Sequence, residues 1–520
     1  MLINFNYLGC NYGEDAPVFF RHPHPKIYKK IEITTEMIKK GIKPTEFKNR
    51  GGLSSKNYKN FFNIIYQRHI TLNKFLKVNK QTGLHTPKTV FEDEKKDLKG
   101  TLNALVLLVD FPDHINETPP EYYNDLLFSK GKVETGSMRD YYREVSWNQL
   151  DINGDVGGWY QANENYSNYV DLGQVNEDTL KWNMPRAKAL VTETLLQAKE
   201  VNSFNFSKYD NDGKGNIDIL IVIYAGEGAE RTSNFSQLYP HRGKLSQPIE
   251  LEDGIVADNY ILMHELPSYD LGGFCHEVAH SLGVPDLYLP DFSSTMVGRW
   301  CLMGVGCYNN DGKTPGHLSA WCKLHLGWAK PETIKGSPQT YSIPAVTGNG
   351  ANIFKLEIKG SGGKEYFLVE NRQQKGFDEF LPSNGLLVWH VDETRGSSYF
   401  PNTDYKHPFL SLEQADGKNE LGERVIEFSS LSLNLTKKDL TGDEGDVYPG
   451  DTNNRNFNSQ SNPNSKSSRG FRSLVSITDI SDSGDVITAK MGSNPSSPNI
   501  PPFPLGHLFK YLKPDTKYKM

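Results

Sequence analysis

The residues with the clearest chemical potential lie in one short stretch, His276-Glu277-Val278-Ala279-His280. On a helix the two histidines, four residues apart, share a face and can bind one metal ion. Glu277 lies beside them, where its carboxylate can hold a water molecule and take its proton. This HExxH pattern is typical of zinc hydrolases.

The residues that follow can supply a third ligand. Gly283 can leave the helix through a positive φ, and Pro285 prevents the helix from resuming. The turn can bring Asp286 to the metal, so the full pattern is HExxHxxGxxD. Three protein ligands leave a fourth position for water, as in catalytic zinc sites. A third ligand from a glutamate on a later helix is disfavoured, because no glutamate occurs from Ser281 to Ala320.

Two further stretches carry candidate functional residues. Met303 lies in a Gly-flanked apolar turn, Trp300 to Gly304, similar to the Met-turn beneath the zinc of metzincins. A lone methionine can also simply fill a core. The acidic loop after Tyr209 is similar to a short calcium loop, although Ile221 stands where an EF-hand has its last glutamate. The alternative is a polar turn before a strand. The candidate calcium ligands are Asp210, Asp212 and Asp218.

Whole-chain properties exclude several classes of protein. The 520 residues suffice for two or three domains, and a net charge of -6 gives no basic excess for nucleic acid. No apolar run is long enough to span a membrane. The first residues lack the basic and apolar segments of a secretory signal, so an internal location, unconventional export and an incomplete start remain open. Two cysteines near the motif could form a disulfide, or all could be buried thiols. They are Cys275, Cys301, Cys307 and Cys322; Cys10 stands apart.

Strands and helices alternate around the motif, which indicates a mixed α/β (α+β) catalytic domain over residues 98–330. We expect a buried strand at Leu105–Phe111 and an amphipathic helix leading into a strand within Ser137–Leu150. The glycines of Asp155–Tyr160 predict a tight turn. Met184–Val201, with Pro185 near its start, predicts a helix, and Ile219–Tyr224 a strand.

The regions on either side of this domain differ from it in composition and in hydrophobic pattern. Residues 1–97 form an N-terminal segment, with helical spacing over Lys59–Val78, that could be a prosegment covering the cleft. Cys10 could then cap the zinc as a thiolate, or be an ordinary surface cysteine. Residues 331–491 contain short alternating runs typical of a β-rich, sandwich-like domain, and residues 492–520 form a Pro-rich, basic tail. Asp416, Asp443 and Asp446 lie in Gly-rich loops that could bind a second cation or be solvated turns.

The chain resembles the M6 family of metalloproteases, the relatives of immune inhibitor A. The resemblance runs from Gly100 to about Met491 in one order. Its motifs are LVLLVDFPD, YYREVSWNQL, AGEGAE, YPHR, CHEVAHSLGVPDLY, CLMGVG, HLGWAKP, EYFLVENR, LPSNGLLVWHVDE, EQADG and GDVYPG.

The resemblance implies a zinc endopeptidase with a metzincin-like fold, usually secreted and often made with a prosegment. His276, His280 and Asp286 match the family's zinc ligands, and Glu277 matches its catalytic acid/base. Calcium also occurs in the family. The loop Leu289–Arg299 lacks the Asp-Thr-Asp that usually follows the tyrosine, which could alter the cleft near the zinc.

We therefore expect a monomeric enzyme that binds Zn²⁺ and acts on proteins or peptides. Two alternatives remain at the level of sequence. One is a non-catalytic surface adhesion or carbohydrate-binding protein built on a metalloprotease scaffold. The other keeps the zinc chemistry but directs it to an amide that is not a peptide bond.

Overall fold

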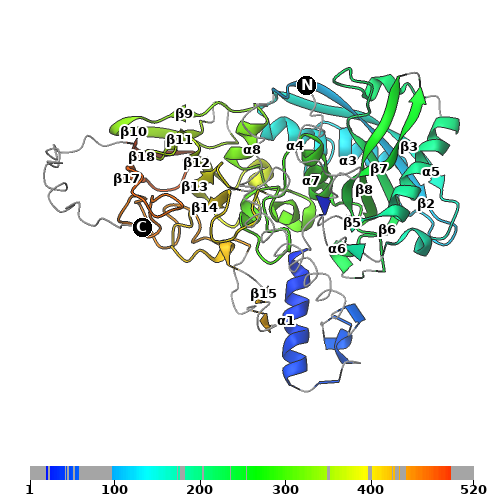
Figure 1. Ribbon diagram of the computed structural model, residues 1–520, viewed down its shortest axis with the longest axis horizontal. Coiled ribbons are helices and arrows are strands. Elements are labelled where there is room, and N and C mark those ends of the chain that lie inside the picture. The colour runs from blue at the N-terminus through cyan, green and yellow to red at the C-terminus, as the bar shows by residue number, and fades with distance from the viewer. Residues whose placement is uncertain are drawn as a thin grey trace, which may run out of the picture.

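The computed structural model comprises a larger region (residues 97–329), a β-rich region (residues 330–493) and an N-terminal segment (Figure 1). It describes residues 19–20, 24–57 and 97–493, apart from residues 41, 44–45, 51–52, 55, 172–173, 176–181, 202–203, 233, 235, 253, 348–351, 396–400, 424–425, 428–431 and 434–440. Cys10 and the predicted Lys59–Val78 helix lie outside these ranges. Among the described residues, no helix has both the length and the apolar composition needed to cross a membrane.

A six-stranded sheet forms the centre of the larger region, in the order β1-β7-β8-β6-β2-β3. Strands β3, β2, β6 and β8 are mutually parallel, β7 runs antiparallel to β8, and β1 pairs antiparallel with β7. The bounds are Phe19–Phe20 for β1, Gly100–Asp110 for β2, Leu150–Gln161 for β3, Leu220–Glu227 for β6, His241–Glu252 for β7 and Ile255–Leu266 for β8.

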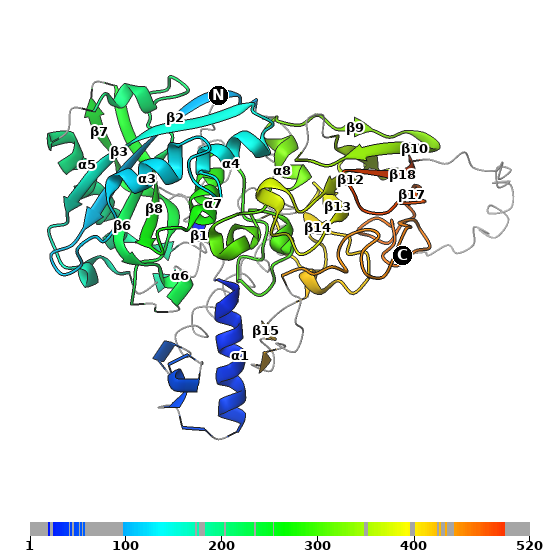
Figure 2. The same ribbon diagram turned by 180° about the vertical axis from the view of Figure 1, so that it is seen from behind.

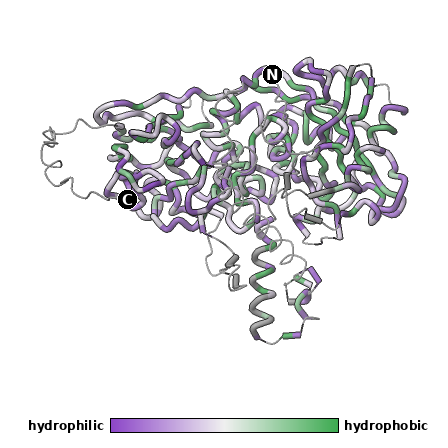
Figure 3. The backbone as a smooth tube through the Cα atoms, viewed as in Figure 1, coloured by the Kyte–Doolittle hydropathy of each residue, from purple (hydrophilic) through white to green (hydrophobic). Residues whose placement is uncertain are grey.

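Strand β2 explains why this sheet is covered by helices on both faces. Val106 and Leu108 belong to the core shared with helices α3, α4 and α7, whereas Leu105 and Leu107 belong to the core shared with α5. A strand that is apolar at every position must be buried on both sides. Figure 2 shows α3 and α4 in front of the sheet, and Figure 3 shows hydrophobic stretches mixed with hydrophilic ones in this part of the chain. The helices are α3 (Pro120–Phe128), α4 (Met138–Val145), α5 (Pro185–Val201), α6 (Ala229–Thr232), α7 (Leu271–Ser281) and α8 (Ala320–His325).

The prediction of a tight turn at Asp155–Tyr160 is wrong. Strand β3 continues through these residues and pairs with β2, with one register shift between Leu107 and Leu108. The glycines permit close approach of neighbours. A Cβ on Gly154 would lie 2.3 Å from the Ala104 carbonyl oxygen, and one on Gly157 would lie 3.0 Å from Leu107. Gly154 and Gly157 therefore allow close packing against neighbouring atoms within a continuous strand, and do not reverse the chain.

The other elements predicted for the larger region are present. The strand after Gly100, the helix that ends at Val145 before β3, the helix that begins at Pro185 and the strand at Leu220 all form. The four cysteines near the HExxH motif are buried free thiols, so the thiol alternative holds in the structure.

The β-rich region contains a five-stranded sheet, β14-β13-β12-β11-β9, and a three-stranded sheet, β10-β18-β17. The two sheets share one cluster of buried side chains, while Leu368, Leu387 and Trp389 on the other face of the larger sheet join the core around α7. The bounds are Glu332–Thr333 (β9), Gly336–Pro344 (β10), Phe354–Glu357 (β11), Glu365–Arg372 (β12), Gly385–Asp392 (β13), Leu410–Leu412 (β14), Val475–Thr478 (β17) and Val486–Ser493 (β18). Two further two-stranded ladders pair β4 (Gln174–Val175) with β5 (Trp182–Asn183) and β15 (Ile426–Glu427) with β16 (Ser432–Leu433).

The N-terminal segment contributes β1 and helix α1 (Pro25–Lys39), which projects away from the body in both views (Figures 1 and 2). His24 precedes this helix, and its backbone N–H donates to the Glu230 carbonyl oxygen at 3.0 Å. Its ring nitrogen Nε2 lies 2.9 Å from the Asp311 carboxylate, and Lys26 pairs with the same carboxylate. The base of α1 is therefore attached beside α6 and the loop that carries Asp311.

Substituting Gly272 with alanine tests the packing of α7. A Cβ at Gly272 would lie 1.8 Å from the Cys307 carbonyl oxygen in the short helix Gly306–Gly312, and this backbone atom cannot move aside cheaply. We expect Gly272→Ala to destabilise the protein by roughly 1–3 kcal/mol, seen as a lower midpoint of thermal unfolding. Gly158→Ala is the matched control, because a Cβ there meets no atom within 4 Å. Equal midpoints for the two variants would contradict this account.

Candidate active site

Helix α7 carries the HExxH residues and is buried along its whole length. The side chain of Asp270 caps its first turn by accepting a hydrogen bond from Gly273 N at 3.3 Å. At its end Gly283 has a φ of 93°, Gly283 N donates to the His280 carbonyl and Val284 N to the Ala279 carbonyl. This is a Schellman turn, and it reverses the chain so that the residues after it return to the helix.

The reversal brings three candidate ligand atoms together. Oδ1 of Asp286 lies 3.1 Å from Nε2 of His276 and 3.4 Å from Nε2 of His280. The two imidazole rings are perpendicular, with centroids 4.8 Å apart. In a tetrahedral zinc site with bonds of about 2.0 Å, neighbouring ligand atoms are about 3.3 Å apart. The spacing of these atoms therefore fits zinc.

Backbone carbonyls orient both rings. Nδ1 of His276 lies 3.0 Å from the Leu302 carbonyl oxygen, and Nδ1 of His280 lies 2.8 Å from that of Val284. Because a carbonyl oxygen only accepts, each Nδ1 must donate, and the lone pair of each neutral ring is left on Nε2. Both Nε2 atoms face Asp286, as metal ligation requires.

The charges at the site favour a cation. Burial would raise the pKa of the Asp286 carboxyl, but the neighbouring His280 and His276 outweigh it and hold that pKa well below its usual range. Burial would lower the pKa of His276, but its contact with Asp286 raises it well above the usual value. Oδ2 of Asp286 is buried and has no hydrogen-bond partner among the described residues. A bound dication would replace the proton between these groups, so the residues present fit a zinc ion.

Glu277 and Tyr288 complete the buried polar groups around the ligands. The side chain of Glu277 is fully buried on the same helix. Tyr288 is stacked parallel to His276, with ring centroids 6.5 Å apart. Burial raises the pKa of Tyr288 well above its usual value, and the charges of Asp286 and Glu277 add to this rise. The phenol is therefore a hydrogen-bond donor beside the ligand set, and the sequence offered no signal for it beyond its place two residues after Asp286.

The turn at Trp300–Gly304 lies against the ligand set. It closes with a hydrogen bond from Gly304 N to the Cys301 carbonyl at 3.0 Å. Leu302 supplies the carbonyl that orients His276, and the carbonyl of Met303 accepts from Leu287 N at 2.9 Å, next to Asp286. We call residues 300–303 the floor segment. Its carbonyls contact His276 directly and Asp286 through the neighbouring Leu287, and Met303 itself is completely buried.

The acidic loop also gathers its carboxylates. Oxygens of Asp210, Asp212 and Asp218 lie within 4.8 Å of one another. Burial, with the nearby charges of Asp212 and Asp210, raises the pKa of Asp218 to about 7. Other contacts fit an ordinary turn: Asp210 and Asp212 accept from Lys214 N at 3.0 and 3.1 Å, and Lys214 Nζ lies 3.0 Å from Asp212.

Two more clusters come from residues distant in sequence. Nε2 of His264 lies 2.9 Å from Glu230 and 3.0 Å from Asp270, and Arg231 pairs with Asp270 at 2.6 Å. With His264 protonated these four groups balance in charge, so we interpret them as an ion-pair network, which no local sequence pattern indicated.

In the β-rich region, Asp416 and Asp443 lie close together, as the sequence suggested, but their third partner is Glu420. Asp446 is directed elsewhere and accepts from Trp300 Nε1 at 2.7 Å. Burial, with the charges of Asp443 and Asp416, raises the pKa of Asp446 to about 7.

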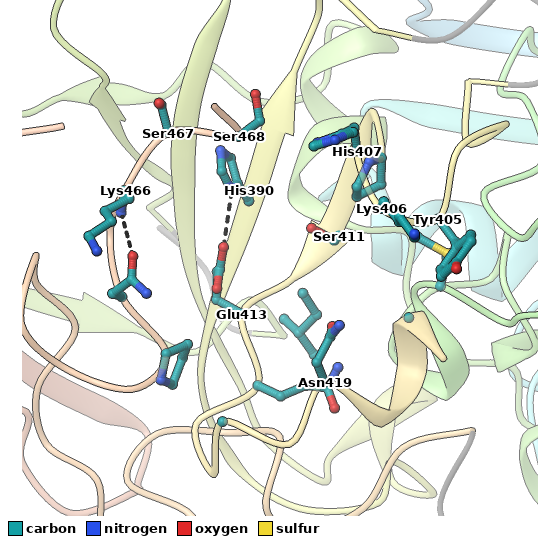
Figure 4. Close-up of a pocket in the computed structure, with 18 of the residues that line it drawn as sticks. His390, Tyr405, Lys406, His407, Ser411, Glu413, Asn419, Lys466, Ser467 and Ser468 are labelled. Carbon is teal, nitrogen blue, oxygen red and sulfur yellow. Dashed lines mark hydrogen bonds and ion pairs between the residues drawn. The ribbon is translucent and has the colours of Figure 1, made fainter. Parts of the chain in front are cut away.

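A polar pocket of about 450 Å³ opens in the β-rich region, away from the three ligands (Figure 4). His390 lies at its floor between two carboxylates, with Nε2 2.9 Å from Glu365 and Nδ1 3.0 Å from Glu413. Burial would lower the pKa of His390, but hydrogen bonds to Glu365 and Glu413 raise it to about 9. Other lining residues include Tyr405, Lys406, His407, Ser411, Asn419, Lys466, Ser467 and Ser468.

The raised pKa of His390 predicts a pH dependence of stability. The unfolded chain has a histidine pKa of about 6.5, so the ion pairs stabilise the fold fully below that pH and are lost as the pH rises towards 9. We expect the unfolding midpoint of the wild type to fall over this interval, and His390→Gln to flatten the fall. His407→Gln, an exposed histidine of the same pocket, is the control. Identical pH profiles for wild type and His390→Gln would refute the assignment.

Comparisons with known proteins agree with the geometry of α7. Residues 92–329 match the model of the immune inhibitor A peptidase M6 catalytic domain. The chain is 30% identical over 308 residues to the pre-pro-metalloprotease PrtV of two strains of Vibrio cholerae serotype O1, a match that covers 49% of this chain and 32% of the relative. It is 24% identical over 313 residues to immune inhibitor A of Bacillus thuringiensis subsp. alesti, covering 51% of this chain and 42% of that protein. The chain thus spans less than half the length of either relative.

Proposed function

Because residues 92–329 match the model of the M6 peptidase catalytic domain, we propose that the protein belongs to this family and is a zinc-dependent endopeptidase that hydrolyses peptide bonds of proteins. The observation that carries the proposal is the convergence of Nε2 of His276, Nε2 of His280 and Oδ1 of Asp286 beside the buried carboxylate of Glu277. Three protein ligands leave a coordination position open, which is the composition of a catalytic zinc site.

In this proposal His276, His280 and Asp286 hold the metal. Zinc, when bound, supplies a Lewis acid that polarises the scissile carbonyl and acidifies the attacking water. Glu277 takes the proton of that water and returns it to the leaving amine. The carbonyls of Leu302 and Val284 keep the imidazoles in the tautomer that offers Nε2 to the metal.

Details of the fold support a metzincin-like catalytic domain over residues 98–330. Four parallel strands are followed at one edge by the antiparallel β7, the HExxH helix follows β8, and the turn carrying Met303 underlies the first ligand. In residues 331–491, two sheets that share one buried cluster support a β-sandwich, followed by the proposed tail.

We also propose that residues 1–97 are a prosegment. Phe19 and Phe20 pair with Arg242 and His241, so the segment extends the sheet at the edge strand β7. An exposed sheet edge is a common place for an extended peptide to bind. His24 and Lys26 attach the segment to Asp311, in the short helix that packs against α7. Secretion and action as a monomer remain parts of the proposal that rest on family resemblance.

The decisive experiment measures zinc content and casein cleavage for the wild type and for Glu277→Gln. We expect one zinc per chain in both proteins, and a loss of cleavage of at least a hundredfold in the variant, because the general base is removed while the ligands stay. Glu379→Gln, an exposed glutamate outside the site, is the control and should keep full activity. Substantial cleavage by Glu277→Gln would contradict the assigned role.

A second experiment tests the N-terminal segment. If the full chain binds zinc but does not cleave casein, the same assay is repeated after proteolytic removal of residues 1–97. Activity that appears only then supports the prosegment. A zinc-loaded protein that stays inactive in both forms favours the non-catalytic, surface-binding alternative, and a protein without zinc rejects the peptidase.

We further propose that Asp210, Asp212 and Asp218 bind calcium. A carboxyl must be ionised to bind Ca²⁺, so with a pKa of about 7 for Asp218, affinity should rise as the pH passes from 6 to 8. We expect calcium to raise the midpoint of thermal unfolding more at pH 8 than at pH 6. Asp218→Asn should abolish the effect, whereas Asp404→Asn, at an exposed site, should preserve it. A calcium response that survives in Asp218→Asn would reject the site.

A further inference from the structure

The orientation of the first zinc ligand depends on the floor segment, residues 300–303. Nδ1 of His276 donates to the Leu302 carbonyl oxygen at 3.0 Å. Leu302 is itself held on its other side, because its backbone N–H donates to the His317 carbonyl at 3.1 Å. The position of the Leu302 carbonyl is therefore set by the segment around Trp300 and by His317.

Both of these anchors are held by one ion pair of the β-rich region. Arg372, the last residue of β12, donates from Nη1 to the Trp300 carbonyl at 3.1 Å. Its Nε and Nη2 donate to Oδ2 and Oδ1 of Asp378 at 2.6 and 2.5 Å. Oδ1 of Asp378 also accepts from the backbone N–H of His317 at 2.9 Å. The pair thus contacts the chain on both sides of Leu302.

The pair is built to keep its geometry. Arg372, Asp378 and His317 are all 0% exposed. Burial would lower the pKa of Arg372 and raise that of Asp378, but their mutual attraction outweighs burial, raising the first and lowering the second to about 2. Both groups therefore stay charged at any ordinary pH. A planar guanidinium bound through two nitrogens also has little freedom to rotate.

Neighbouring charges complete the arrangement. Glu370 accepts from Arg372 at 3.3 Å and from Trp389 Nε1 at 2.8 Å, and Lys323 lies 3.8 Å from Glu370. Nε2 of His317 lies 2.8 Å from Glu144, the penultimate residue of α4. Buried charges of this kind stabilise a structure only when each is paired. Their pairing fixes β12, the floor segment and α4 relative to one another.

We propose that Arg372 and Asp378 are positioning residues of the zinc site, acting through Trp300, His317 and the Leu302 carbonyl on His276. The inference rests on the proposed zinc function. It assigns a role at the metal to residues that lie beyond the matched catalytic domain, which ends at residue 329. Outer hydrogen-bond partners of metal ligands typically change metal affinity by about 10–100-fold when they are altered.

Arg372→Lys is the informative variant, because lysine keeps a positive charge beside Asp378, but its three donors share one nitrogen and cannot reproduce the planar fork that bonds both Asp378 oxygens and the Trp300 carbonyl. We expect zinc affinity, measured by competition with a chelator in the full chain, to fall by about 10–100-fold. The d–d absorption of the Co²⁺-substituted protein should change as well, since the ligand geometry changes. A purely structural role would lower the unfolding midpoint and leave both readouts as in the wild type.

Arg455→Lys is the matched control. Arg455 likewise pairs with a carboxylate, that of Asp482, and donates to a backbone carbonyl, that of Ile480. Within the described part of the chain its side chain bonds residues 453, 480 and 482, and not the floor segment. Its zinc affinity and Co²⁺ spectrum should equal those of the wild type. Equal values in Arg372→Lys and Arg455→Lys would overturn the inference. A wild type that binds no zinc would instead reject the proposed function.

Hydrogen exchange on the wild-type chain keeps the inference testable should Arg372→Lys fail to fold. Coupling between two sites acts in both directions. Removing zinc should therefore speed hydrogen exchange of the His317 amide, which donates to Asp378. The reference is the Ile477 amide, which donates to the Phe457 carbonyl in the β-rich region. Unchanged protection of His317 on removal of zinc would overturn the inference.

Discussion

A carboxylate and two imidazoles are held together inside this protein, away from water, and much of the fold serves that arrangement. Asp286 is 1% exposed and lies within 3.4 Å of Nε2 of both His276 and His280. Burial opposes the charge on the carboxylate, so the cluster is stable only with positive charge among its members. Each Nδ1 donates its proton to a backbone carbonyl. The positive charge, whether it comes from a proton on Nε2 or from a metal ion, therefore lies on the side of the rings that faces Asp286.

Those carbonyls are supplied by two different kinds of structure. The Val284 carbonyl comes from the Schellman turn that ends α7, a local feature of the six residues 279–284. The Leu302 carbonyl comes from the floor segment, which the β-rich region holds through Arg372 and through the hydrogen bond from Trp300 to Asp446. The core around α7 likewise includes side chains of β12 and β13. The β-rich region is thus part of the structural support of the site.

Patterns of short range allowed good predictions. The spacing of His276 and His280, the glycine that can adopt a positive φ and the aspartate three residues later predicted three metal ligands, and the structure brings these candidate ligand atoms close together. The same holds for the apolar run of β2 and for the helix that starts at Pro185. Gly157 and Gly158 misled because a glycine in a turn and a glycine within a strand look alike in sequence. The contact that marks Gly157 as a packed strand residue comes from Leu107 of β2, 50 positions away, and only the fold supplies it.

The grouping of these three side chains could therefore be predicted from the amino acids alone, because helix periodicity and glycine stereochemistry act over a few residues. The support of the site could not. Trp300 and Arg372 are 72 positions apart in sequence. His264 lies in β8, whereas its partners Glu230 and Asp270 lie in α6 and at the start of α7. Whether such charges pair or remain solvated depends on how deeply they are buried and on which partner packs beside them. These are properties of the assembled fold, and no local pattern of residues encodes them.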